Sequence, residues 1–268
     1  MKRELTGQTI VLTGANSGIG AATAVACARA GMNVLLSGRD NKRLGRVADE
    51  VRRCGVRAET VAADVTQPGL GEHLLDVADE TLDGFYAVFA NAGYGYKRPA
   101  HELGMDELRQ MFEVNFFAGY ELVTAAARRL IQRAHGGHLL MCSSALAKFT
   151  MVNFSAYSAT KAAQNHVCRA MRLELEPHRI AVSSVHPITT RTDFFVRADA
   201  AAGGHTDPAR VYDHVPRWML QPAERVGAAV VRCLQRPRPE VWTSVLVRLA
   251  AGVVTAFPAL ADAIGRRG

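Results

Sequence analysis

The sequence lacks the features that mark a repetitive, multidomain or secreted protein. It contains no internal repeat, no low-complexity tract and no long stretch of proline, glycine and serine, so a second domain has no evident place to begin. The first residues contain no long apolar run like that of a secretory signal, and we therefore expect a cytoplasmic protein. With 268 residues, of which 49% are hydrophobic, the chain can bury a large core, and we predict one domain over 1–268.

The cysteines and the charges argue against two further classes of site. The five cysteines include no C-x-x-C pair, a distribution that fits reduced core thiols better than disulfides or a zinc site, so we expect no metal. The net charge is +7, but the arginines are spread along several predicted helices and do not gather with aromatic residues in one stripe. We therefore expect a solvated surface with one phosphate-binding spot and no nucleic-acid partner.

A glycine-rich turn joins a predicted strand over 8–13 to a predicted helix over 21–30. Without side chains at Gly14, Gly18 and Gly20, the turn can be tight and the backbone can approach a pyrophosphate, whose charge the free N–H groups of the helix N-terminus would meet. A glycine-rich turn without a ligand is the alternative. The residues that this interpretation assigns to a dinucleotide are Gly14, Asn16, Ser17, Gly18, Ile19 and Gly20.

The predicted second strand, over 33–37, ends in Gly38-Arg39-Asp40. A dinucleotide site of this kind commonly has an acid here that holds the adenosine ribose hydroxyls, whereas a 2′-phosphate calls for a nearby arginine. Gly38 stands where the acid would be, and Arg39 follows it. We therefore expect NADP(H) to be preferred over NAD(H), with one more surface arginine on a basic protein as the alternative.

Small or polar residues also follow the next two predicted strands, over 56–63 and 85–89. Asp64, followed by Val65, can accept a hydrogen bond from an adenine amino group or cap the next helix. Asn91-Ala92-Gly93 would let the chain pass close to a ribose, and the asparagine can tie neighbouring strands together. A simple turn is the alternative for this tripeptide.

A tyrosine and a lysine, Tyr157 and Lys161, stand four residues apart in a helix predicted over 155–176 and therefore share one face. An ammonium beside a phenol favours the phenolate, which brings the pKa from near 10 toward neutrality and lets the tyrosine exchange a proton. Ser144, after the strand predicted over 138–142, can steady a carbonyl oxygen. The alternative is a half-exposed tyrosine beside a solvated lysine.

A long helical pattern over 106–130 is interrupted near Asn115, a residue with low helix propensity. Either this is a tolerated surface asparagine, or its side chain perturbs the helix to serve a polar site. Strands alternate with helices along the whole chain. This order predicts an α/β fold, a doubly wound parallel sheet with helices on both faces.

Together these motifs resemble the short-chain dehydrogenase/reductase family, in the branch that consists of a single Rossmann-type domain. The resemblance covers about 7–245 and implies a catalytic tetrad of Asn115, Ser144, Tyr157 and Lys161. In that family the serine and tyrosine bind the substrate oxygen, and the lysine holds the nicotinamide ribose and lowers the tyrosine pKa. The asparagine anchors a water in a proton relay.

The resemblance also implies contacts with the cofactor outside the glycine turn. Two positions depart from the family pattern: Ala90 replaces the first asparagine of Asn-Asn-Ala-Gly, and Ile188 replaces the glycine of the usual Pro-Gly, which would narrow the pocket beside the nicotinamide. The implied contacts are Asp64, Val65, Asn91, Ala92, Gly93, Tyr157, Lys161, Pro187, Thr190 and Thr192.

The segment over 189–218 is too long for an ordinary connection and is predicted to form a lid over a substrate pocket. Aromatic and aliphatic residues surround the tetrad in the sequence, so we expect a lipophilic substrate, although ordinary core packing would explain them as well. The predicted substrate contacts are Ala145, Leu146, Phe154, Phe194 and Trp218.

The apolar tail over 245–264 is broken by Arg248, Gly252 and Pro258. A membrane span is disfavoured because an arginine in mid-segment costs about 2.5–3.5 kcal/mol. We expect instead a helix that packs on the domain, on another subunit or on a bilayer surface. A homodimer or homotetramer and a peripheral location at a membrane are both compatible with such a tail.

The leading hypothesis is an NADP(H)-dependent oxidoreductase that moves a hydride between the nicotinamide and a ketone or secondary alcohol, with Tyr157 as general acid/base. A non-catalytic NADP(H) sensor on the same fold is the alternative, but a sensor would not need the four residues of the tetrad together. An epimerase or dehydratase of related fold is a second alternative. The short chain after the strand predicted over 180–185 argues against it.

Overall fold

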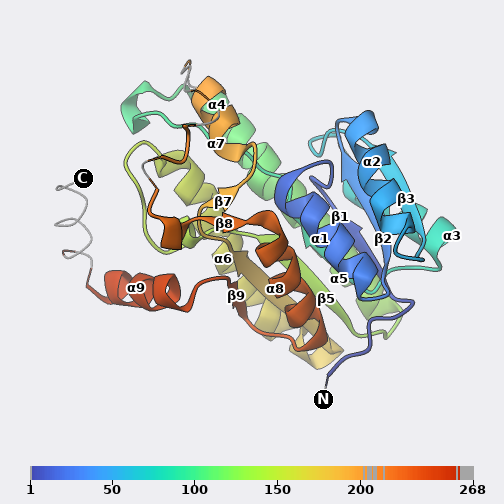
Figure 1. Cartoon of the computed structure of the whole chain (residues 1–268). Helices are drawn as coiled ribbons and strands as arrows, with labels where there is room; N and C mark the ends of the chain where they lie inside the picture. Colours follow the sequence, from blue (N-terminus) through green and yellow to red (C-terminus); the bar gives the residue numbers. More distant parts are fainter. Residues whose placement is uncertain are drawn as a thin grey trace.

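The structure is a computed structural model, and it describes residues 2–201, 203, 207, 210–213, 215–257 and 259. Its centre is a seven-stranded parallel sheet (Figure 1) in the order β3-β2-β1-β4-β5-β6-β9. The strands are β1 (Thr9–Leu12), β2 (Asn33–Gly38), β3 (Ala58–Ala62), β4 (Ala87–Ala90), β5 (Gly137–Cys142), β6 (Ile180–His186) and β9 (Glu240–Trp242).

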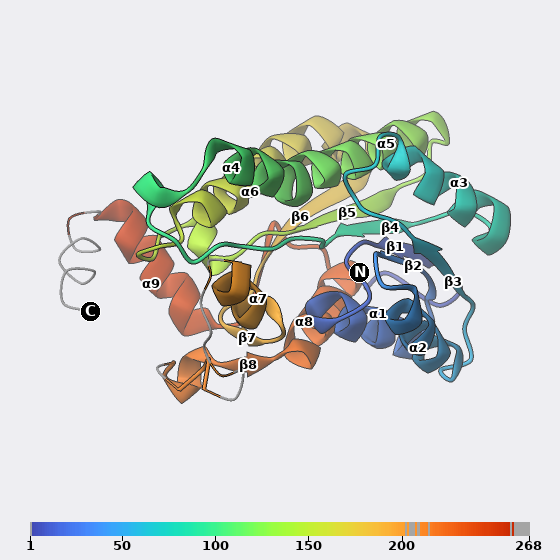
Figure 2. The same ribbon diagram turned by 90° about the horizontal axis from the view of Figure 1, so that it is seen from above.

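Helices cover both faces of this sheet (Figure 2), as a doubly wound fold requires. One layer contains α1 (Gly18–Arg29), α2 (Asn41–Arg52) and α8 (Ala223–Gln235). The other layer contains α3 (Leu70–Leu82), α4 (Met105–Phe112), α5 (Ala118–Gln132) and α6 (Ser155–Leu175). The fold predicted from the order of elements is confirmed.

The strands are apolar on both sides because both of their faces are covered. In β1, Leu12 belongs to the core beneath α1, α2 and α8, whereas its neighbour Val11 belongs to the core beneath α3, α5 and α6. Strands β1, β2, β4 and β5 are buried at every position. Continuous apolar strands of this kind leave only the strand ends for polar, ligand-binding side chains.

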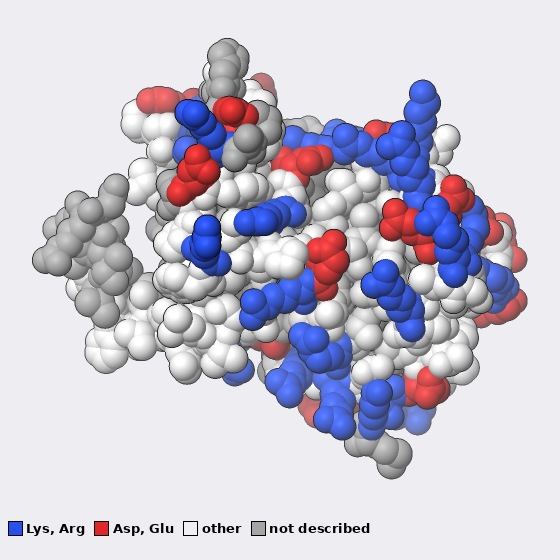
Figure 3. Space-filling model, viewed as in Figure 1, with Lys and Arg blue, Asp and Glu red and all other residues white. Residues whose placement is uncertain are grey.

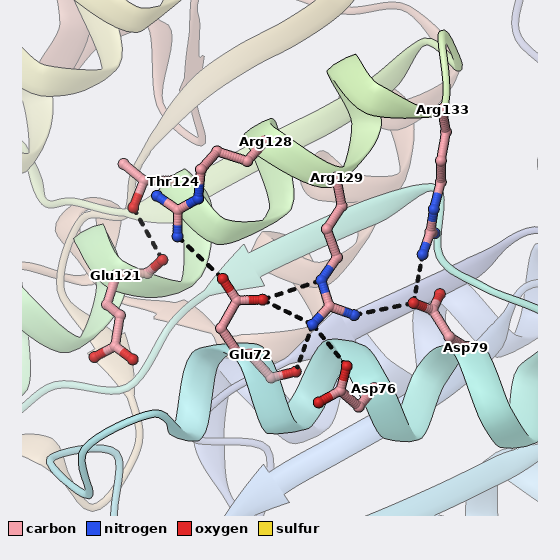
Figure 4. A network of polar contacts seen from close by, with 8 residues as sticks. All are labelled: Glu72, Asp76, Asp79, Glu121, Thr124, Arg128, Arg129 and Arg133. Atoms are coloured by element: carbon pink, nitrogen blue, oxygen red, sulfur yellow. Dashed lines mark hydrogen bonds and ion pairs between the residues drawn. The ribbon is translucent and has the colours of Figure 1, made fainter.

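A network of charges joins α3 to α5 on the outside of the sheet (Figure 4). Arg129 of α5 donates from Nη2 to Glu72 Oε2 at 2.7 Å and to Asp76 Oδ1 at 2.7 Å, and from Nη1 to Asp79 Oδ2 at 3.0 Å. Arg133 also donates to Asp79. The partly buried Arg129 thus holds three carboxylates of one helix, which fixes how α3 and α5 lie on the sheet.

The helical pattern predicted over 106–130 is indeed interrupted at Asn115. It consists of α4, a π-helical turn over Glu113–Phe117 and α5. A π-turn adds a residue to the helical repeat and so re-aims the side chains within it. Asn115 is fully buried, so it is not the surface asparagine that the sequence also allowed.

The segments predicted as lid and tail contain several short elements. The lid contains β7 (Thr190–Arg191), α7 (Phe194–Ala201) and a 3-10 turn over Arg217–Met219, which leads into β8 (Gln221–Pro222). The tail begins with α9 (Val245–Ala256). The positions of the predicted lid and tail that lie outside the described residues are 202, 204–206, 208, 209 and 214, and 258 and 260–264.

None of the helices in the described residues combines the length and the apolar character that crossing a bilayer requires.

Candidate active site

A cavity of about 510 Å³ lies where the carboxyl ends of the parallel strands meet. Every predicted site residue lines it except Gly20, Asn115 and Trp218. One end is formed by the glycine turn, Arg39 and Asp64, and the other by apolar side chains around Tyr157. The structure therefore brings the predicted cofactor and catalytic residues into one continuous space.

The glycine turn has the geometry of an anion site. Gly14 and Gly18 have φ values of +63° and +55°, a left-handed conformation that favours glycine. Gly20 lies beneath the turn, where an added Cβ would stand 2.2 Å from the carbonyl oxygen of Gly14. At the start of α1, Ser17 makes no side-chain cap to a described residue and the first turn carries no acid. The free N–H groups fit the negative charge of a pyrophosphate.

Asn91 ties the ends of two central strands together, as the sequence indicated. Its Nδ2 donates to the carbonyl oxygens of Thr13 at 3.0 Å and Gly14 at 3.3 Å. In return, Thr13 Oγ1 accepts from the backbone N–H groups of Asn91 at 3.0 Å and Ala92 at 3.2 Å. The glycine turn after β1 is thereby fixed against the chain after β4, at the point where the strand order reverses.

The end of the cavity that was predicted to hold an adenosine contains one exposed arginine, Arg39, and no acid at the end of β2. A Cβ on Gly38 would lie 2.8 Å from Asn16 Oδ1, so an acidic side chain there would displace Asn16. Arg39 has a 75% exposed side chain and stands 3.6 Å from Asp64, measured from Nη1 to Oδ2. Asp64 also accepts from Thr66 N at 3.0 Å, a bond that lowers its pKa. Asp64 therefore lines the cavity and also closes the turn after β3.

Ser144, Tyr157 and Lys161 converge at the centre of the cavity. Ser144 lies just beyond β5, and the other two lie one turn apart on the buried side of α6. Lys161 Nζ donates to the carbonyl oxygen of Cys142 at 2.7 Å and stands 5.5 Å from the centre of the Tyr157 ring. The ammonium thus lies beside the ring and is anchored to β5.

Burial dominates the electrostatics of this group. It raises the pKa of the Tyr157 hydroxyl above its usual range; the Cys142 thiol adds to the increase, and the hydrogen bond with Ser144 opposes it. Burial also lowers the pKa of the Lys161 ammonium to about 8. Lys161 was expected to bring the tyrosine pKa toward neutrality, but the pKa of Tyr157 changes in the opposite direction, because desolvation of the phenolate is the largest cause of its shift.

Asn115 supports the cavity from behind and does not line it. Its Oδ1 accepts from Tyr94 N at 2.9 Å, and its Nδ2 donates to Tyr94 O at 2.8 Å and to Thr160 Oγ1 at 3.1 Å. Its own carbonyl oxygen accepts from Gln164 Nε2 at 2.6 Å. The π-turn therefore serves a polar role, because it lets one buried amide hold the chain after β4 against α6.

The apolar end of the cavity is built from the lid and the turn after β5. Phe194 of α7 packs on Tyr157 with ring centres 5.1 Å apart, and Phe195 packs on Phe154 at 6.1 Å. The hydroxyl of Tyr212 donates to the carbonyl oxygen of Thr192 at 2.7 Å, which fastens the lid at its start. Predicted contacts Phe154, Phe194, Leu146 and Ala145 all line the space.

Trp218 is the predicted substrate contact that the structure places elsewhere. Its side chain is 59% exposed, and the neighbouring Met219 lines the cavity in its place. The two residues belong to a 3-10 turn, in which successive side chains point about a third of a turn apart. The sequence therefore predicted the correct segment, but the side chain that faces the cavity is that of Met219 and not that of Trp218.

Val247, which lines the cavity, and Gly95, which packs against Tyr157, are among the residues that were not predicted as site residues. Val247 of α9 lines the cavity and packs with Ala145 and Ile188. Gly95 lies so close to the catalytic ring that a Cβ would stand 2.9 Å from Phe194 Cζ and 3.2 Å from Tyr157 Cδ2. The glycine between two tyrosines at 94–96 was a signal for close packing, whereas nothing local indicated that the tail returns to the site.

Known proteins share this sequence pattern and this fold. The chain is 34% identical over 200 residues to the 1-deoxy-11-beta-hydroxypentalenate dehydrogenase of Streptomyces exfoliatus, covering 73% of each chain. It is 28% identical over 230 residues to the 7alpha-hydroxysteroid dehydrogenase of Escherichia coli (strain K12), covering 85% of this chain and 88% of that one.

A solved short-chain dehydrogenase/reductase from Burkholderia phymatum, in complex with NAD, has a similar fold, with a TM-score of 0.85 over 96% of both chains at 21% identity. Residues 8–202 of the present sequence match the family described as short chain dehydrogenase. With its parallel sheet, its glycine turn and its serine, tyrosine and lysine in one cavity, the protein belongs to the short-chain dehydrogenase family of oxidoreductases.

Proposed function

We propose that the protein is an NADP(H)-dependent oxidoreductase that interconverts a lipophilic ketone and the corresponding secondary alcohol. The observation that carries the proposal is the continuity of one cavity from the glycine turn and Arg39 to Ser144, Tyr157 and Lys161. A sensor without catalysis would have no use for a buried hydroxyl pair at the apolar end. The dehydrogenases among the relatives support the same reaction class.

The cofactor would lie along the polar half of the cavity, with its pyrophosphate at the start of α1, its 2′-phosphate at Arg39 and its nicotinamide ribose at Lys161. When bound, the nicotinamide supplies or accepts the hydride at the reacting carbon. Ser144 and Tyr157 would hold the substrate oxygen between their hydroxyl groups.

Tyr157 would move the proton. Because burial keeps its hydroxyl protonated at neutral pH, the resting protein is prepared to donate that proton to a carbonyl oxygen as the carbon becomes reduced. In the opposite direction the same oxygen must first lose its proton, which its burial disfavours. Reduction of the ketone is therefore the direction that the resting protonation favours.

The first prediction concerns Tyr157→Phe, which removes the hydroxyl and keeps the ring against Phe194. We expect turnover to fall by a factor of about 10² to 10⁴, because a positioned acid/base group is lost, and cofactor affinity to stay nearly unchanged. Lys161→Ala should impair both. Steady-state kinetics and fluorescence titration of NADPH measure the two effects, and a Tyr157→Phe protein with more than about a tenth of the normal rate would refute the role.

The second prediction concerns cofactor choice. A charge-assisted hydrogen bond from Arg39 to a 2′-phosphate contributes about 1.5–3 kcal/mol, equivalent to roughly a ten- to hundredfold preference for NADPH over NADH. Because Arg39 is exposed, we expect the lower part of this range. The comparison is the ratio of the two dissociation constants in the wild type and in Arg39→Ala.

Arg43 provides the matched control for that experiment. It is also partly exposed, and its ion pairs with Asp193 at 3.1 Å and Asp40 at 3.4 Å are shorter than the 3.6 Å contact of Arg39 with Asp64. Arg43→Ala should leave the preference for NADPH intact, whereas Arg39→Ala should reduce it. Equal affinities for the two cofactors in the wild type would contradict the assignment of Arg39.

The third prediction concerns the substrate. Apolar rings at the catalytic end of the cavity gain about 25 cal/mol for each Å² of apolar surface that a substrate buries, whereas a polyol would leave hydroxyl groups without partners. Catalytic efficiency should therefore rise along a series of ketones as the alkyl or ring portion grows. Phe154→Ala should flatten this rise and Trp218→Ala should not, and best activity on a small polar carbonyl would rule the proposal out.

We further propose that the outward face of α9 rests on a lipid surface and that the protein is a cytoplasmic homodimer or homotetramer. The helix buries Val247 and Ala251 against the domain, and the surface over α9 is largely uncharged (Figure 3). A stripe about 18 Å long on a helix about 10 Å wide covers roughly 180 Å², far less than the roughly 800 Å² that each partner buries in a stable dimer, which favours lipid over a subunit at this face. The exposed apolar residues of the stripe are Leu246, Leu249, Val253 and Phe257.

The fourth prediction tests α9 with vesicles of phosphatidylcholine, with and without phosphatidylglycerol. The wild type should sediment with the vesicles, and Leu249→Asp should do so at least about tenfold less, because a charge replaces an exposed aliphatic side chain that would enter the lipid. Leu173→Asp changes an equally exposed leucine on α6 and should have no effect. If Leu249→Asp instead lowers the particle mass in light scattering, α9 is a subunit contact and the lipid proposal is wrong.

A further inference from the structure

A buried histidine connects the proposed catalytic serine to the edge of the sheet. His186 is the last residue of β6 and is fully buried. Its Nδ1 lies 2.8 Å from the carbonyl oxygen of Ser144, and its Nε2 lies 2.9 Å from Ser184 Oγ. Its ring stacks on Trp242 of β9, with centres 4.7 Å apart and planes 9° from parallel.

The partners determine which nitrogen carries the proton. A carbonyl oxygen only accepts, so the hydrogen must be on Nδ1 and point to Ser144. Burial lowers the pKa of His186 to about 4, so the ring is neutral at pH 7 and Nε2 accepts from the hydroxyl of Ser184. The Nδ1–H group of His186 therefore donates a hydrogen bond to the backbone of Ser144, the serine proposed to act in catalysis.

The turn that carries Ser144 is held at its other end as well. Ser144 caps the 3-10 turn over Ala145–Ala147, its Oγ accepting from Leu146 N at 3.1 Å, and Lys148 ends this turn. Lys148 Nζ donates to Glu240 Oε1 at 2.7 Å, and the other oxygen of Glu240 accepts from Trp242 Nε1 at 2.9 Å.

Both ends of the turn are therefore fixed by residues at the ends of β6 and β9, His186 at the start and Glu240 at the finish. The carbonyl oxygen of Ser144 also accepts from Ala147 N at 3.1 Å, a bond that lies within the turn. Among the described contacts, the bond from His186 is the one that joins that carbonyl to the sheet. Ala145 N also donates to Pro187 O at 3.1 Å and Ser143 Oγ donates to Lys161 O at 2.8 Å, so His186 orients the turn together with these bonds.

We propose that His186 is a positioning residue for Ser144, whose Nδ1–H bond holds the serine backbone where the hydroxyl meets Tyr157. The proposal rests on the catalytic role proposed for Ser144. Displacing a catalytic group by about 1 Å can cost on the order of a hundredfold in rate, so a bond to the backbone of Ser144 is enough to matter. His186 need not touch substrate or cofactor for this effect.

Two substitutions of His186 distinguish the effect of its hydrogen bond to Ser144 from the effect of losing the imidazole ring. In His186→Asn the amide Nδ2 takes the place of Nδ1 and can still donate to Ser144, whereas in His186→Gln the amide reaches toward Ser184 and leaves Ser144 without this donor. We expect His186→Gln to lower kcat roughly ten- to a hundredfold, with the Kd for NADPH unchanged, and His186→Asn to retain most of kcat.

The pH profile gives a second readout. The hydrogen bond with Ser144 lowers the pKa of Tyr157, so a displaced serine should shift the apparent pKa of the proton-transfer step upward in His186→Gln and not in His186→Asn. His138 is the matched structural control, because it is also fully buried and its Nε2 lies 2.8 Å from Ser183 Oγ, away from Ser144. His138→Gln should lower the melting temperature without changing kcat or the pH profile.

Hydrogen exchange of the peptide over 144–148 tests the proposal without any substrate. The amides of this peptide should exchange at least about tenfold faster in His186→Gln than in the wild type, His186→Asn or His138→Gln. Unchanged exchange in His186→Gln, or equal effects of the Asn and Gln substitutions on kcat, would overturn the positioning role. If the amide exchange of 144–148 differs between the variants as expected but the wild type turns over no ketone or alcohol, the proposed function would be refuted. The hydrogen bond from His186 would then order the turn without a role in catalysis.

Discussion

Parallel pairing of all seven strands is the constraint on which the site depends. Because every strand pair is parallel, every strand ends at the same edge of the sheet, and polar residues just past those ends become neighbours. Thr13, Asn91, Ser144 and His186 occupy such positions after four adjacent strands or at their last residue. Most strand positions are apolar and both faces are covered, so the polar side chains of the sheet that line the cavity lie at or just past the strand ends.

Burial at that edge disfavours the charged forms of two neighbouring groups, so it moves their pKa values in opposite directions. It raises the pKa of the Tyr157 hydroxyl and lowers that of the Lys161 ammonium, so both groups are pushed toward their neutral forms. A hydroxyl that stays protonated is able to donate its proton, so this pKa direction agrees with the role proposed for Tyr157.

Local sequence predicted the fold, and it placed Gly14, Arg39 and Asn91 at one cavity, because these residues lie next to strand ends. The interruption at Asn115 was predicted as well, since an asparagine conflicts with helix propensity there. The direction of the Tyr157 pKa shift was not predicted, because it depends on burial by distant segments of the chain. The prediction that Trp218 contacts the substrate pocket was wrong for a related reason, because the geometry of a short turn sets the direction of its side chain.

The C-terminal helix shows most clearly why the rest of the site escaped prediction. Ile188 replaces a glycine of the family pattern, and the structure uses its side chain: it packs with Ala145, next to Ser144, and with Val247 of α9. A glycine at this position would leave a gap beside Val247, so the packing of α9 against the domain depends on the side chain of Ile188. Val247 and Ile188 lie 59 positions apart in sequence (247 minus 188), beyond the reach of any local pattern. The end of the cavity beside Ala145 and Ile188 therefore has α9 as a wall, so under the proposed function the substrates that fit would depend on how firmly that helix is held.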